Sequence, residues 1–357
     1  MPTSPGRSVS GLGDGEPRRA PGEGSTAACR SHHRALASSD GSYSHPVTDR
    51  PRVAVVVLNY LAVDDTRTAV ESVQRGDFLE SLIVVVDNSP DVRVTESLRA
   101  HLDPCVTLVR AGDNIGYAAG NNLGIRKALE LAPVDYVWVL NPDTLVAPDA
   151  LSWLVLAADS DPGAAIVASR LVSADGASIL YDGATIDPVS GATTLLGSGL
   201  PTSGSPANAA RATDYAHGAS MLLRTASMAH LGRMTEDYFL YFEETDFSLR
   251  ARRAGSRILI EPRSVVRHTR RSWGELPTST YIYYMVRNRE IFAERWGFDP
   301  VASRGATDHF TASWRGRVRQ HRPDLVDTFD ALVAGALADG VAGRAGRSDL
   351  PSELVLA

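Results

Sequence analysis

The sequence DYVWVLNPDTLVA, at residues 135–147, joins an apolar run to an abrupt polar ending. Its first part, 136–140, is rich in β-branched and aromatic residues, which predicts a buried strand rather than a helix. In open α/β folds, ligands bind at the carboxyl ends of the strands, so Asp143 is a candidate metal or ligand contact. Asn141, Pro142, Asp143 and Thr144 are also ordinary turn residues, and a plain turn is the alternative interpretation.

The same design occurs twice upstream. RVAVVVLNY at 52–60 and SLIVVVDNSPD at 81–91 are apolar runs with polar endings, separated by a predicted helix at 65–75. A shorter strand is predicted in VTLVR at 106–110. Alternating strands and helices predict an α/β fold with a mostly parallel sheet, which is a Rossmann-like nucleotide-binding unit. No G-x-G-x-x-G turn follows the first strand, which argues against an NAD-dependent enzyme.

Asp87 ends the second of these strands. A carboxylate at this position is suited to accept the ring N–H of a uracil or thymine base. The alternative is a turn-forming residue after a strand.

Three glycines recur at helical spacing in AGDNIGYAAGNNLGIRKALEL, residues 111–131, where a loop is predicted to run into a helix near 115–117. Glycine inside a helix costs about 1 kcal/mol relative to alanine, so something must approach Gly116, Gly120 and Gly124 closely. It is either the neighbouring strand or the ribose and diphosphate of a nucleotide at the helix N-terminus. Asn114 and Asn121 supply donors and acceptors suited to a hydroxylated ligand.

Composition limits the function classes. The chain has 357 residues, 43% of them hydrophobic, and a formal charge of −6, which does not suit a nucleic-acid-binding protein. Two cysteines are too few for a disulfide framework, so we expect a reducing, cytoplasmic location. We find neither a membrane-spanning stretch nor a signal peptide. Residues 1–50 are rich in Gly, Pro, Ser and Arg, which predicts a disordered N-terminal extension.

The most informative carboxylates are Glu243, Glu244 and Asp246, in FLYFEETDFSLRARRAG at 239–255. Acids in the first turn, arginines in the last and Gly255 beyond it predict a helix at 243–254, and these acids are also good partners for the helix dipole. The preceding aromatic residues predict a surface that stacks on sugar rings. Clustered carboxylates at an apolar rim raise one another's pKa, which suits a general base.

The rest of the chain is predicted more briefly. We expect a helix near 150–159, a strand near 166–172, hairpins and a loop over the cleft at 173–214, and a strand in HGASMLLR at 217–224. RILIEP at 257–262 predicts another strand and TSTYIYYMVRNREIFAERW at 278–296 a helix. Two polar helices are expected beyond 298, with one at 324–338.

Several motifs together carry a family resemblance. In order they are LNY at 58–60, VDNS at 86–89, DNIGYAAGNN at 113–122, NPD at 141–143, HGASMLLR at 217–224 and YFLYFEETDFSLRARRAG at 238–255. In order and spacing, residues 52–296 resemble a family-two glycosyltransferase, with most likeness to the rhamnosyltransferase-like branch. The resemblance implies a GT-A fold with a nucleotide-binding half at 51–147, an acceptor-binding half at 148–296 and a C-terminal helical extension at 297–357.

The resemblance also implies roles for residues. Asp87 looks like the base-contacting carboxylate, Asp143 like the metal-binding end of a D-x-D motif that begins with Asn141, and Glu244 like the catalytic base, with Glu243 and Asp246 as further catalytic candidates. His268, beside Arg267, Arg270 and Arg271, resembles a metal or diphosphate ligand. Arg287 and Asn288 resemble an Arg-Asn pair that closes over the donor. Further donor contacts are expected from Asn59, Asn114, Gly116 and Asn121.

We therefore expect an inverting glycosyltransferase that moves a sugar from a dTDP- or UDP-sugar, with dTDP-rhamnose as the best candidate, to a saccharide, lipid-linked or small-molecule acceptor. Mg or Mn would bind at the diphosphate, and the enzyme would work in the cytoplasm or at the inner face of the membrane. The alternatives are a nucleotidyltransferase, or a non-catalytic protein that binds nucleotide sugars.

Overall fold

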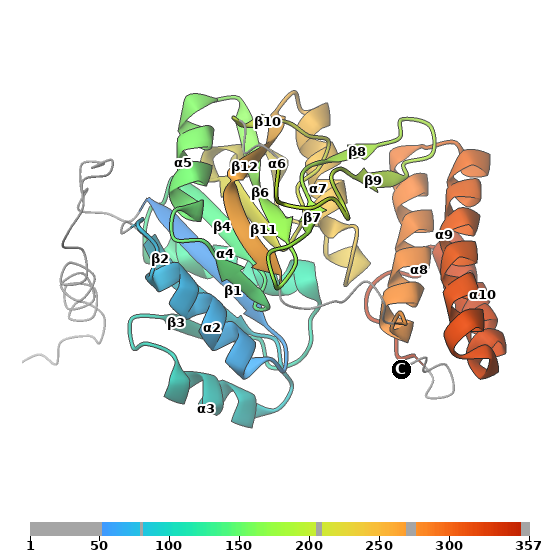
Figure 1. The fold of residues 1–357 in the computed structure, drawn as a ribbon. Helices are drawn as coiled ribbons and strands as arrows, with labels where there is room; N and C mark the ends of the chain where they lie inside the picture. Colours follow the sequence, from blue (N-terminus) through green and yellow to red (C-terminus); the bar gives the residue numbers. More distant parts are fainter. Residues whose placement is uncertain (1–51, 79–80, 205–208, 269–275, 351–357) are drawn as a thin grey trace, which may run out of the picture. The chain divides into compact units, whose positions relative to one another are not determined.

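A ten-stranded sheet runs through the computed structural model, which describes residues 52–78, 81–204, 209–268 and 276–350 (Figure 1). The strands lie in the order β10-β12-β6-β11-β4-β1-β2-β3, with β5 beside β12 and β7 beside β6. The N-terminal extension expected at 1–50 lies outside the described residues.

Four parallel strands form the N-terminal part of the sheet, as the sequence predicts. They are β1 (Val53–Asn59), β2 (Ser81–Asp87), β3 (Thr107–Arg110) and β4 (Tyr136–Leu140). β1 lies between β2 and β4 and is buried along its whole length, because both of its faces are covered. The helices that connect these strands are α2 (Val63–Gln74), α3 (Val92–His101) and α4 (Tyr117–Leu131).

The sheet becomes mixed beyond β4. β11 (Ser220–Arg224) runs antiparallel to β4 and to β6 (Ala164–Val172), and β12 (Arg257–His268) runs parallel to β6. The short strand β5 (Thr144–Val146) pairs antiparallel with the end of β12, opposite His268. The helix α5 (Ala150–Ser160) packs against β12 and β6. The predicted parallel sheet is therefore confirmed for β1 to β4, and the antiparallel members are additional.

Short elements fill the region between β6 and β12. As expected for 173–214, they are small strands: β7 (Ile179–Tyr181), the hairpin of β8 (Ala184–Ile186) and β9 (Thr193–Leu195), and β10 (Arg211–Ala212). They are followed by α6 (Thr225–Leu231), the 3-10 turn η1 (Glu236–Tyr238) and α7 (Glu243–Arg253). The observed bounds of α7 confirm the helix predicted from its acids and arginines.

The C-terminal part is helical. α8 (Ser279–Trp296), α9 (Pro300–His321) and α10 (Val326–Val341) lie side by side, with the turn η2 (Pro323–Leu325) between the last two (Figure 1). The predicted polar helices thus exist, but α10 also carries a buried apolar face with Phe329, Leu332 and Ala336. Together with α8 and Phe239, this face forms a second hydrophobic core.

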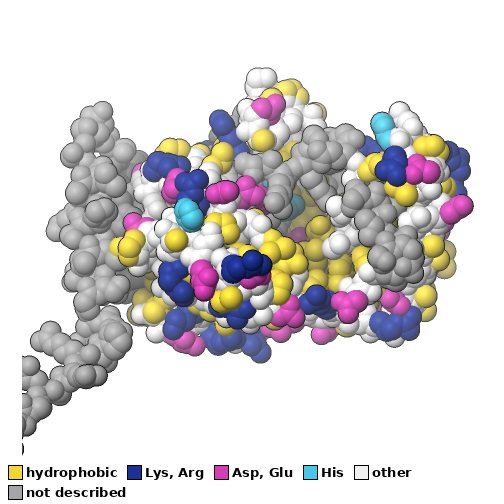
Figure 2. Space-filling view, turned by 90° about the horizontal axis from the view of Figure 1, so that it is seen from below, with side chains coloured by type: hydrophobic (Ala, Val, Ile, Leu, Met, Phe, Trp, Pro, Cys, Tyr) yellow, Lys and Arg dark blue, Asp and Glu magenta, His cyan; other side chains and the backbone are white. Residues whose placement is uncertain are grey.

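Charges of both signs are interspersed on the face shown in Figure 2, without a concentrated basic patch. Among the helices of the described ranges, none combines the length and the apolar character that crossing a bilayer requires.

Candidate active site

The carboxyl ends of β1 and β2 meet at one edge of the sheet, because Asn59 pairs with Asp87 in register. Both side chains are fully buried. The Asp87 carboxylate accepts hydrogen bonds from Asn59 Nδ2 (2.9 Å), from the backbone N–H of Ser89 (3.0 Å) and from Thr95 Oγ1. Asn59 Oδ1 accepts bonds from the Ala62 backbone and from Thr66. In this structure both side chains stabilise the ends of the strands. To contact a nucleotide-sugar donor, as the sequence predicts, they would have to replace some of these hydrogen bonds by bonds to the ligand.

Asn88 connects the end of β2 to the N-terminus of α4. Its Nδ2 donates to Asn114 Oδ1 (3.0 Å) and to the carbonyl of Gly116 (3.3 Å), and its Oδ1 accepts from the N–H of Ile115 (3.1 Å). Asn114 is half-buried, and its Oδ1 also accepts from the Gly116 N–H. The loop that precedes α4 is therefore fixed to the same edge of the sheet as Asp87.

The close approaches to the three glycines come from the protein itself. A Cβ on Gly120 would meet Leu58 of β1 at 2.4 Å, and one on Gly124 would meet Val56 at 2.4 Å. Gly116 has a φ of +92°, and a Cβ there would lie 2.7 Å from the carbonyl oxygen of Phe239. Of the two explanations left open by the sequence, strand packing holds for Gly120 and Gly124. For Gly116 the close neighbour is the backbone of Phe239, and the expected nucleotide contact stays a prediction.

Asp143 and His268 are brought together by the β5–β12 pairing. Thr144 lies opposite His268 in that ladder, so Asp143, one residue earlier, reaches the imidazole with 3.3 Å between Oδ1 and Nε2. This distance makes an electrostatic contact but not a well-aligned hydrogen bond, because the buried Nε2 has no hydrogen-bond partner in the described part of the chain. Asn141 is half-buried, and its N–H donates to the Ala219 carbonyl (3.0 Å).

His217 lies beside His268, with ring centroids 6.5 Å apart. Burial and, to a smaller extent, the neighbouring His268 lower the pKa of His217 to about 4, while Asp143 opposes the shift. His217 is therefore a neutral imidazole at neutral pH, and its Nδ1 accepts the N–H of Ala219 (3.1 Å).

Tyr117, at the start of α4, is the residue that links the carboxylates. Its hydroxyl donates to the carbonyl of Gly218 (2.7 Å). Burial raises the pKa of Tyr117 well above its usual value, and the charges of Glu244, Glu243 and Asp143 raise it further. Carboxylates from the β4–β5 connection and from α7 therefore act electrostatically on one phenol. Asn121, one turn later, donates to the Tyr117 carbonyl (3.0 Å), and its buried Oδ1 has no partner among the described residues.

Glu243 and Glu244 begin α7, directly after the strained residues Tyr241 and Phe242, whose φ angles are +68° and +77°. Burial raises the pKa of Glu243 well above its usual range, and the Glu244 charge adds to this effect. Burial also raises the pKa of Glu244 to about 7, while the N–H groups at the helix start oppose the shift. Each side chain has a buried Oε2 without a partner in the described residues. These two oxygens can accept a proton or a hydrogen bond from a ligand.

Asp246 is not a member of this group. It is 1% exposed and accepts hydrogen bonds from Thr235 Oγ1 (2.7 Å), Tyr238 OH (3.2 Å), Arg250 Nη2 (2.7 Å) and Trp296 Nε1 (2.9 Å). With its oxygens bonded in this way, Asp246 stabilises the packing of α7 against α8. A catalytic role for Asp246 stays a prediction, and these four hydrogen bonds do not support it.

Arg287, which the sequence predicts to close over the donor, is enclosed by the protein in this structure. It is 1% exposed, and its guanidinium donates to Asn288 Oδ1 (2.9 Å), the Gly346 carbonyl (2.6 Å) and the Tyr238 carbonyl (2.8 Å). A side chain that is enclosed and bonded on all sides does not close over a donor from solvent. Arg270 and Arg271, expected beside His268, lie outside the described residues.

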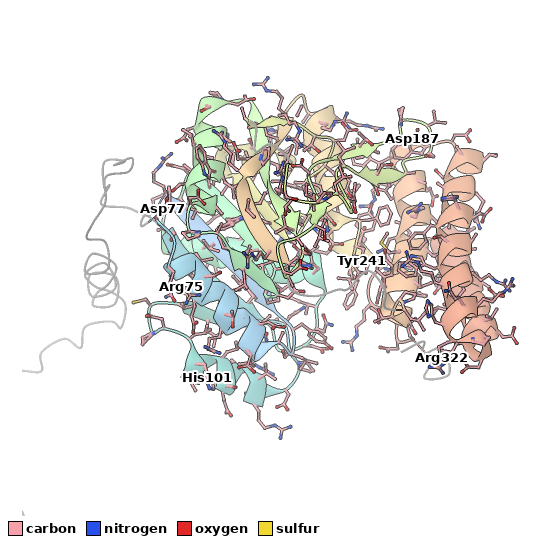
Figure 3. The ribbon with its side chains drawn as sticks, viewed as in Figure 1. Arg75, Asp77, His101, Asp187, Tyr241 and Arg322 are labelled. Carbon is pink, nitrogen blue, oxygen red and sulfur yellow. The ribbon has the colours of Figure 1, made fainter. Side chains whose placement is uncertain are left out.

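The aromatic residues before α7 are mostly core. Tyr238, Phe239 and Phe242 are buried, whereas Tyr241 is half-buried, lies between the sheet and α8 in Figure 3, and contacts the Tyr281 ring edge-on at 5.4 Å. An extended aromatic surface for stacking on sugars is therefore not formed. The motifs DNIGYAAGNN and HGASMLLR contain Tyr117 and His217, but no pattern in the sequence marks these two residues as functional.

Asp143 and His268 are two potential metal ligands: the carboxylate suits Mg²⁺ and Mn²⁺, whereas the imidazole suits transition metals better than Mg²⁺. The described ranges contain no group of three or more His, Cys, Asp or Glu side chains arranged around a common point. A metal at this place would take its remaining ligands from a bound diphosphate or from water.

Comparison with known proteins agrees with this geometry. Residues 53–195 match the family model described as Glycosyl transferase family 2. The low-salt glycan biosynthesis hexosyltransferase Agl10 of Haloferax volcanii is 27% identical over 203 residues, which is 56% of this chain and 62% of that protein, so the match spans less than two thirds of that relative. The N-acetylglucosaminyl-diphospho-decaprenol L-rhamnosyltransferase of Mycobacterium tuberculosis is 27% identical over 214 residues, 52% of this chain and 68% of that protein.

Among solved structures, GalNAc-T7 with UDP, GalNAc and Mn²⁺ superimposes with a TM-score of 0.52 at 17% identity, covering 79% of this chain and 58% of that one. This likeness concerns the fold. The matched region includes β1 to β4 and the residues at their carboxyl ends, so the sequence resemblance to this family is confirmed. The chain thus carries a glycosyl transferase family 2 domain, at residues 53–195, on a fold of the GT-A type.

Proposed function

We propose that this protein is an inverting glycosyltransferase that moves a sugar from a pyrimidine nucleotide sugar to an acceptor hydroxyl. The observation that carries the proposal is the pair Glu243 and Glu244, which begins α7 with two unpartnered buried oxygens and acts electrostatically on the same Tyr117 hydroxyl as Asp143. The family 2 domain supports the class of reaction.

Glu244 is the proposed general base. With a pKa of about 7 it is partly ionised at neutral pH and strong enough to accept a proton from a hydroxyl as that oxygen becomes a nucleophile. The acceptor oxygen forms a bond to the anomeric carbon while the bond from that carbon to the diphosphate breaks. The proton passes to Glu244 and the electron pair leaves with the diphosphate, so one displacement inverts the anomeric centre. Glu243 stays protonated and donates a hydrogen bond to the acceptor.

Asp143 and His268 are the residues proposed to hold a divalent metal at the diphosphate. The fit is supported by the buried, unpartnered Nε2 of His268 and by its distance of 3.3 Å from the Asp143 carboxylate. When bound, such a metal neutralises negative charge on the leaving group. His217 stays neutral beside Asp143 and His268, so it does not repel a metal ion bound there.

The donor is proposed to be dTDP-rhamnose, or otherwise another dTDP- or UDP-sugar. The rhamnosyltransferase named above supports the sugar, and the edge formed by the ends of β1, β2 and β4 supports the position of the nucleotide. The acceptor proposed is a saccharide hydroxyl on a lipid-linked carrier, by analogy with the same relative, and the reaction would then occur at the inner face of the membrane.

Thermal stability with a panel of ligands tests the proposal. dTDP-rhamnose, UDP-glucose, UDP-GlcNAc and GDP-mannose would each be added with and without Mn²⁺. We expect a pyrimidine nucleotide sugar to raise Tm by an amount that increases with its concentration relative to Kd, and GDP-mannose to have little effect. Release of the nucleoside diphosphate, with NMR of the product anomer, then tests turnover and inversion.

Two results would overturn the proposal. Release of pyrophosphate from a nucleoside triphosphate and a sugar phosphate would identify a nucleotidyltransferase. Binding of a nucleotide sugar without transfer to any acceptor or to water would identify a non-catalytic binding protein.

A further inference from the structure

The backbone that precedes α7 has an unusual conformation. Residues 238–242, which we call the aromatic segment, read YFLYF, and three of them have positive φ: Phe239 (+64°), Tyr241 (+68°) and Phe242 (+77°). Glycine adopts such angles easily, whereas for bulky residues they are strained and persist only where the surroundings impose them. Apart from Leu61, these are the non-glycine residues with positive φ in the described chain.

Asn288 of α8 bonds directly to this backbone. Its Nδ2 lies 2.9 Å from the carbonyl oxygen of Tyr238, 2.8 Å from that of Leu240 and 2.9 Å from that of Tyr241. The side chain is fully buried. Carbonyls at residues with mixed φ signs point in directions that no regular helix or strand uses. The two N–H groups of one buried amide are shared among three of them.

Arg287 fixes the orientation of that amide. Its Nε donates to Asn288 Oδ1, which leaves Nδ2 as the atom that faces the carbonyls, and its Nη2 donates to the Tyr238 carbonyl. The guanidinium also lies over the Tyr284 ring at 4.6 Å and donates to the Gly346 carbonyl. The hydrogen bonds observed for Arg287 all go to neutral oxygens. Burying a cation without a carboxylate partner costs free energy. We therefore explain the burial of the Arg287 guanidinium by the way it orients the Asn288 amide and the Tyr238 carbonyl, and not by an ion pair.

The aromatic segment contacts both parts of the candidate active site. On one side, the Phe239 carbonyl accepts the backbone N–H of Tyr117 (2.7 Å). On the other side, the Phe242 carbonyl accepts the N–H of Asp246 and so begins α7, which places Glu243 and Glu244. A change in the segment would therefore move the two glutamates relative to Tyr117.

We propose that Arg287 and Asn288 are positioning residues: they hold the aromatic segment in its strained conformation and thereby place Glu243 and Glu244 against Tyr117 and the acceptor. This inference rests on the proposed function for its catalytic consequence, but the hold on the backbone can be tested without turnover. Arg287 and Asn288 themselves touch no substrate.

The test compares Asn288→Ala with Val286→Ala. Val286 is a buried apolar residue on the same helix and in the same core, so its truncation destabilises α8 without removing a carbonyl bond. We expect hydrogen exchange in residues 239–243 to become at least tenfold faster in Asn288→Ala than in Val286→Ala, when the two are compared at equal distance below their Tm. Equal exchange in the two variants would overturn the proposal, whether or not the protein is an enzyme.

Kinetics give the second readout. Asn288→Ala should lower kcat at least tenfold with donor KM changed less than threefold, and should shift the midpoint of the kcat–pH profile away from its wild-type position, because Glu244 leaves its buried site. Val286→Ala should leave that midpoint unchanged. Asn288→Gln, which keeps the amide, should recover part of kcat, whereas Asn288→Asp should not, because a carboxylate cannot donate to carbonyls.

The outcomes separate the two hypotheses. If wild-type protein turns over no nucleotide sugar, the proposed function fails and the exchange experiment still decides the positioning role. If wild-type protein is active and Asn288→Ala has the same kcat and pH midpoint as Val286→Ala, the positioning role fails and the proposed function stands.

Discussion

Glu244 is the residue on which the proposed chemistry depends most directly. Glu244→Gln keeps the shape of the side chain but removes its basicity, so we expect donor binding to be retained and kcat to fall by about 10²- to 10⁴-fold. Donor binding is measured by the ligand-induced rise in Tm, and turnover by release of the nucleoside diphosphate. Glu236→Gln is the control, because Glu236 is exposed and accepts a hydrogen bond from Asn122, not from Glu243 or Glu244. Near-normal turnover in Glu244→Gln would assign the base to another group, with Glu243 as the next to test.

The raised pKa of Glu244 makes both activity and stability depend on pH. A general base must be deprotonated, so kcat should rise with pH through a midpoint near 7. Stability should change in the opposite direction. The folded pKa lies above the usual value of 4.5, so the folded protein keeps a proton that the unfolded chain releases, and the free energy of unfolding falls as pH rises from about 4.5 to about 7.

This loss should be on the order of 1 to 3 kcal/mol for Glu244, since each pKa unit corresponds to about 1.4 kcal/mol. Urea unfolding of the wild-type protein and of Glu244→Gln at pH 5 and pH 8 measures it. The variant should lose less stability between the two pH values than the wild-type protein. An equal loss in both would mean that Glu244 titrates normally.

Asp143 should act on the nucleotide through a cation. We expect Asp143→Ala to weaken nucleotide binding at least tenfold when Mn²⁺ is present and to have a smaller effect in EDTA. Isothermal titration of the nucleoside diphosphate with and without Mn²⁺ provides the comparison. If the wild-type protein binds equally well in both conditions, the metal has no part in donor binding.

At the scale of elements, the contact between α4 and the aromatic segment depends on one glycine. In Gly116→Ala the added Cβ would lie 2.7 Å from the Phe239 carbonyl oxygen, at a φ of +92° that alanine disfavours. We expect a loss of about 1 to 3 kcal/mol in stability, measured by urea unfolding, because the Tyr117–Phe239 backbone bond must lengthen.

Gly305→Ala is the matched control. Gly305 lies inside α9, and no atom lies within 4 Å of the place that a Cβ would take, so the added methyl meets open space. This substitution should be neutral or stabilising by up to about 1 kcal/mol, because alanine favours the helix. If both variants were equally stable, the close approach at Gly116 would have no energetic consequence.

The elements that sequence predicts well are those whose signal is local. β1, β2 and β4 follow from apolar runs, and α7 follows from its acids, arginines and Gly255, so their bounds agree with the structure within one or two residues. The Asp143–His268 contact depends on an antiparallel pairing between β5 and the end of β12, residues far apart in the chain. No local pattern specifies such a pairing, and only the resemblance to a family connects the two residues.

Arg287 shows a second limit of sequence. In MVRNRE, residues 285–290, four polar residues follow one another on a helix, and nothing in the pattern says that the first three are buried. Their burial depends on α9 and α10, which pack against α8, and on the aromatic segment. A charged side chain is normally exposed, so the sequence leads to the prediction that Arg287 contacts the nucleotide-sugar donor at the surface.

At the scale of the described molecule, two hydrophobic cores meet at the aromatic segment. The larger core surrounds the sheet and includes Phe242 and Phe292, while the second contains Phe239 with residues of α8, α9 and α10. The chain after α10 adds polar contacts: Gly346 bonds Arg287 and Asp237, and Arg347 lies 3.2 Å from Asp113 in the loop before α4. The last pair is exposed and should contribute at most about 1 kcal/mol. The C-terminal helices α8 to α10 are therefore coupled to the site by the hydrogen bonds of Asn288 and Arg287 and by the packing of the second core that supports α8.

Leu332→Ala tests this coupling. Leu332 is fully buried in the second core, and its truncation should cost about 2 to 5 kcal/mol by loss of apolar contact and formation of a cavity. We expect hydrogen exchange to become at least tenfold faster in α8, in α10 and in the aromatic segment, while β1 and β4, in the larger core, stay protected until global unfolding. Val341→Ala, at a 66% exposed position of the same helix, should change none of these rates. Faster exchange confined to α10 would mean that the helical layer opens without releasing the residues that precede Glu243, and would separate the C-terminal helices from the site.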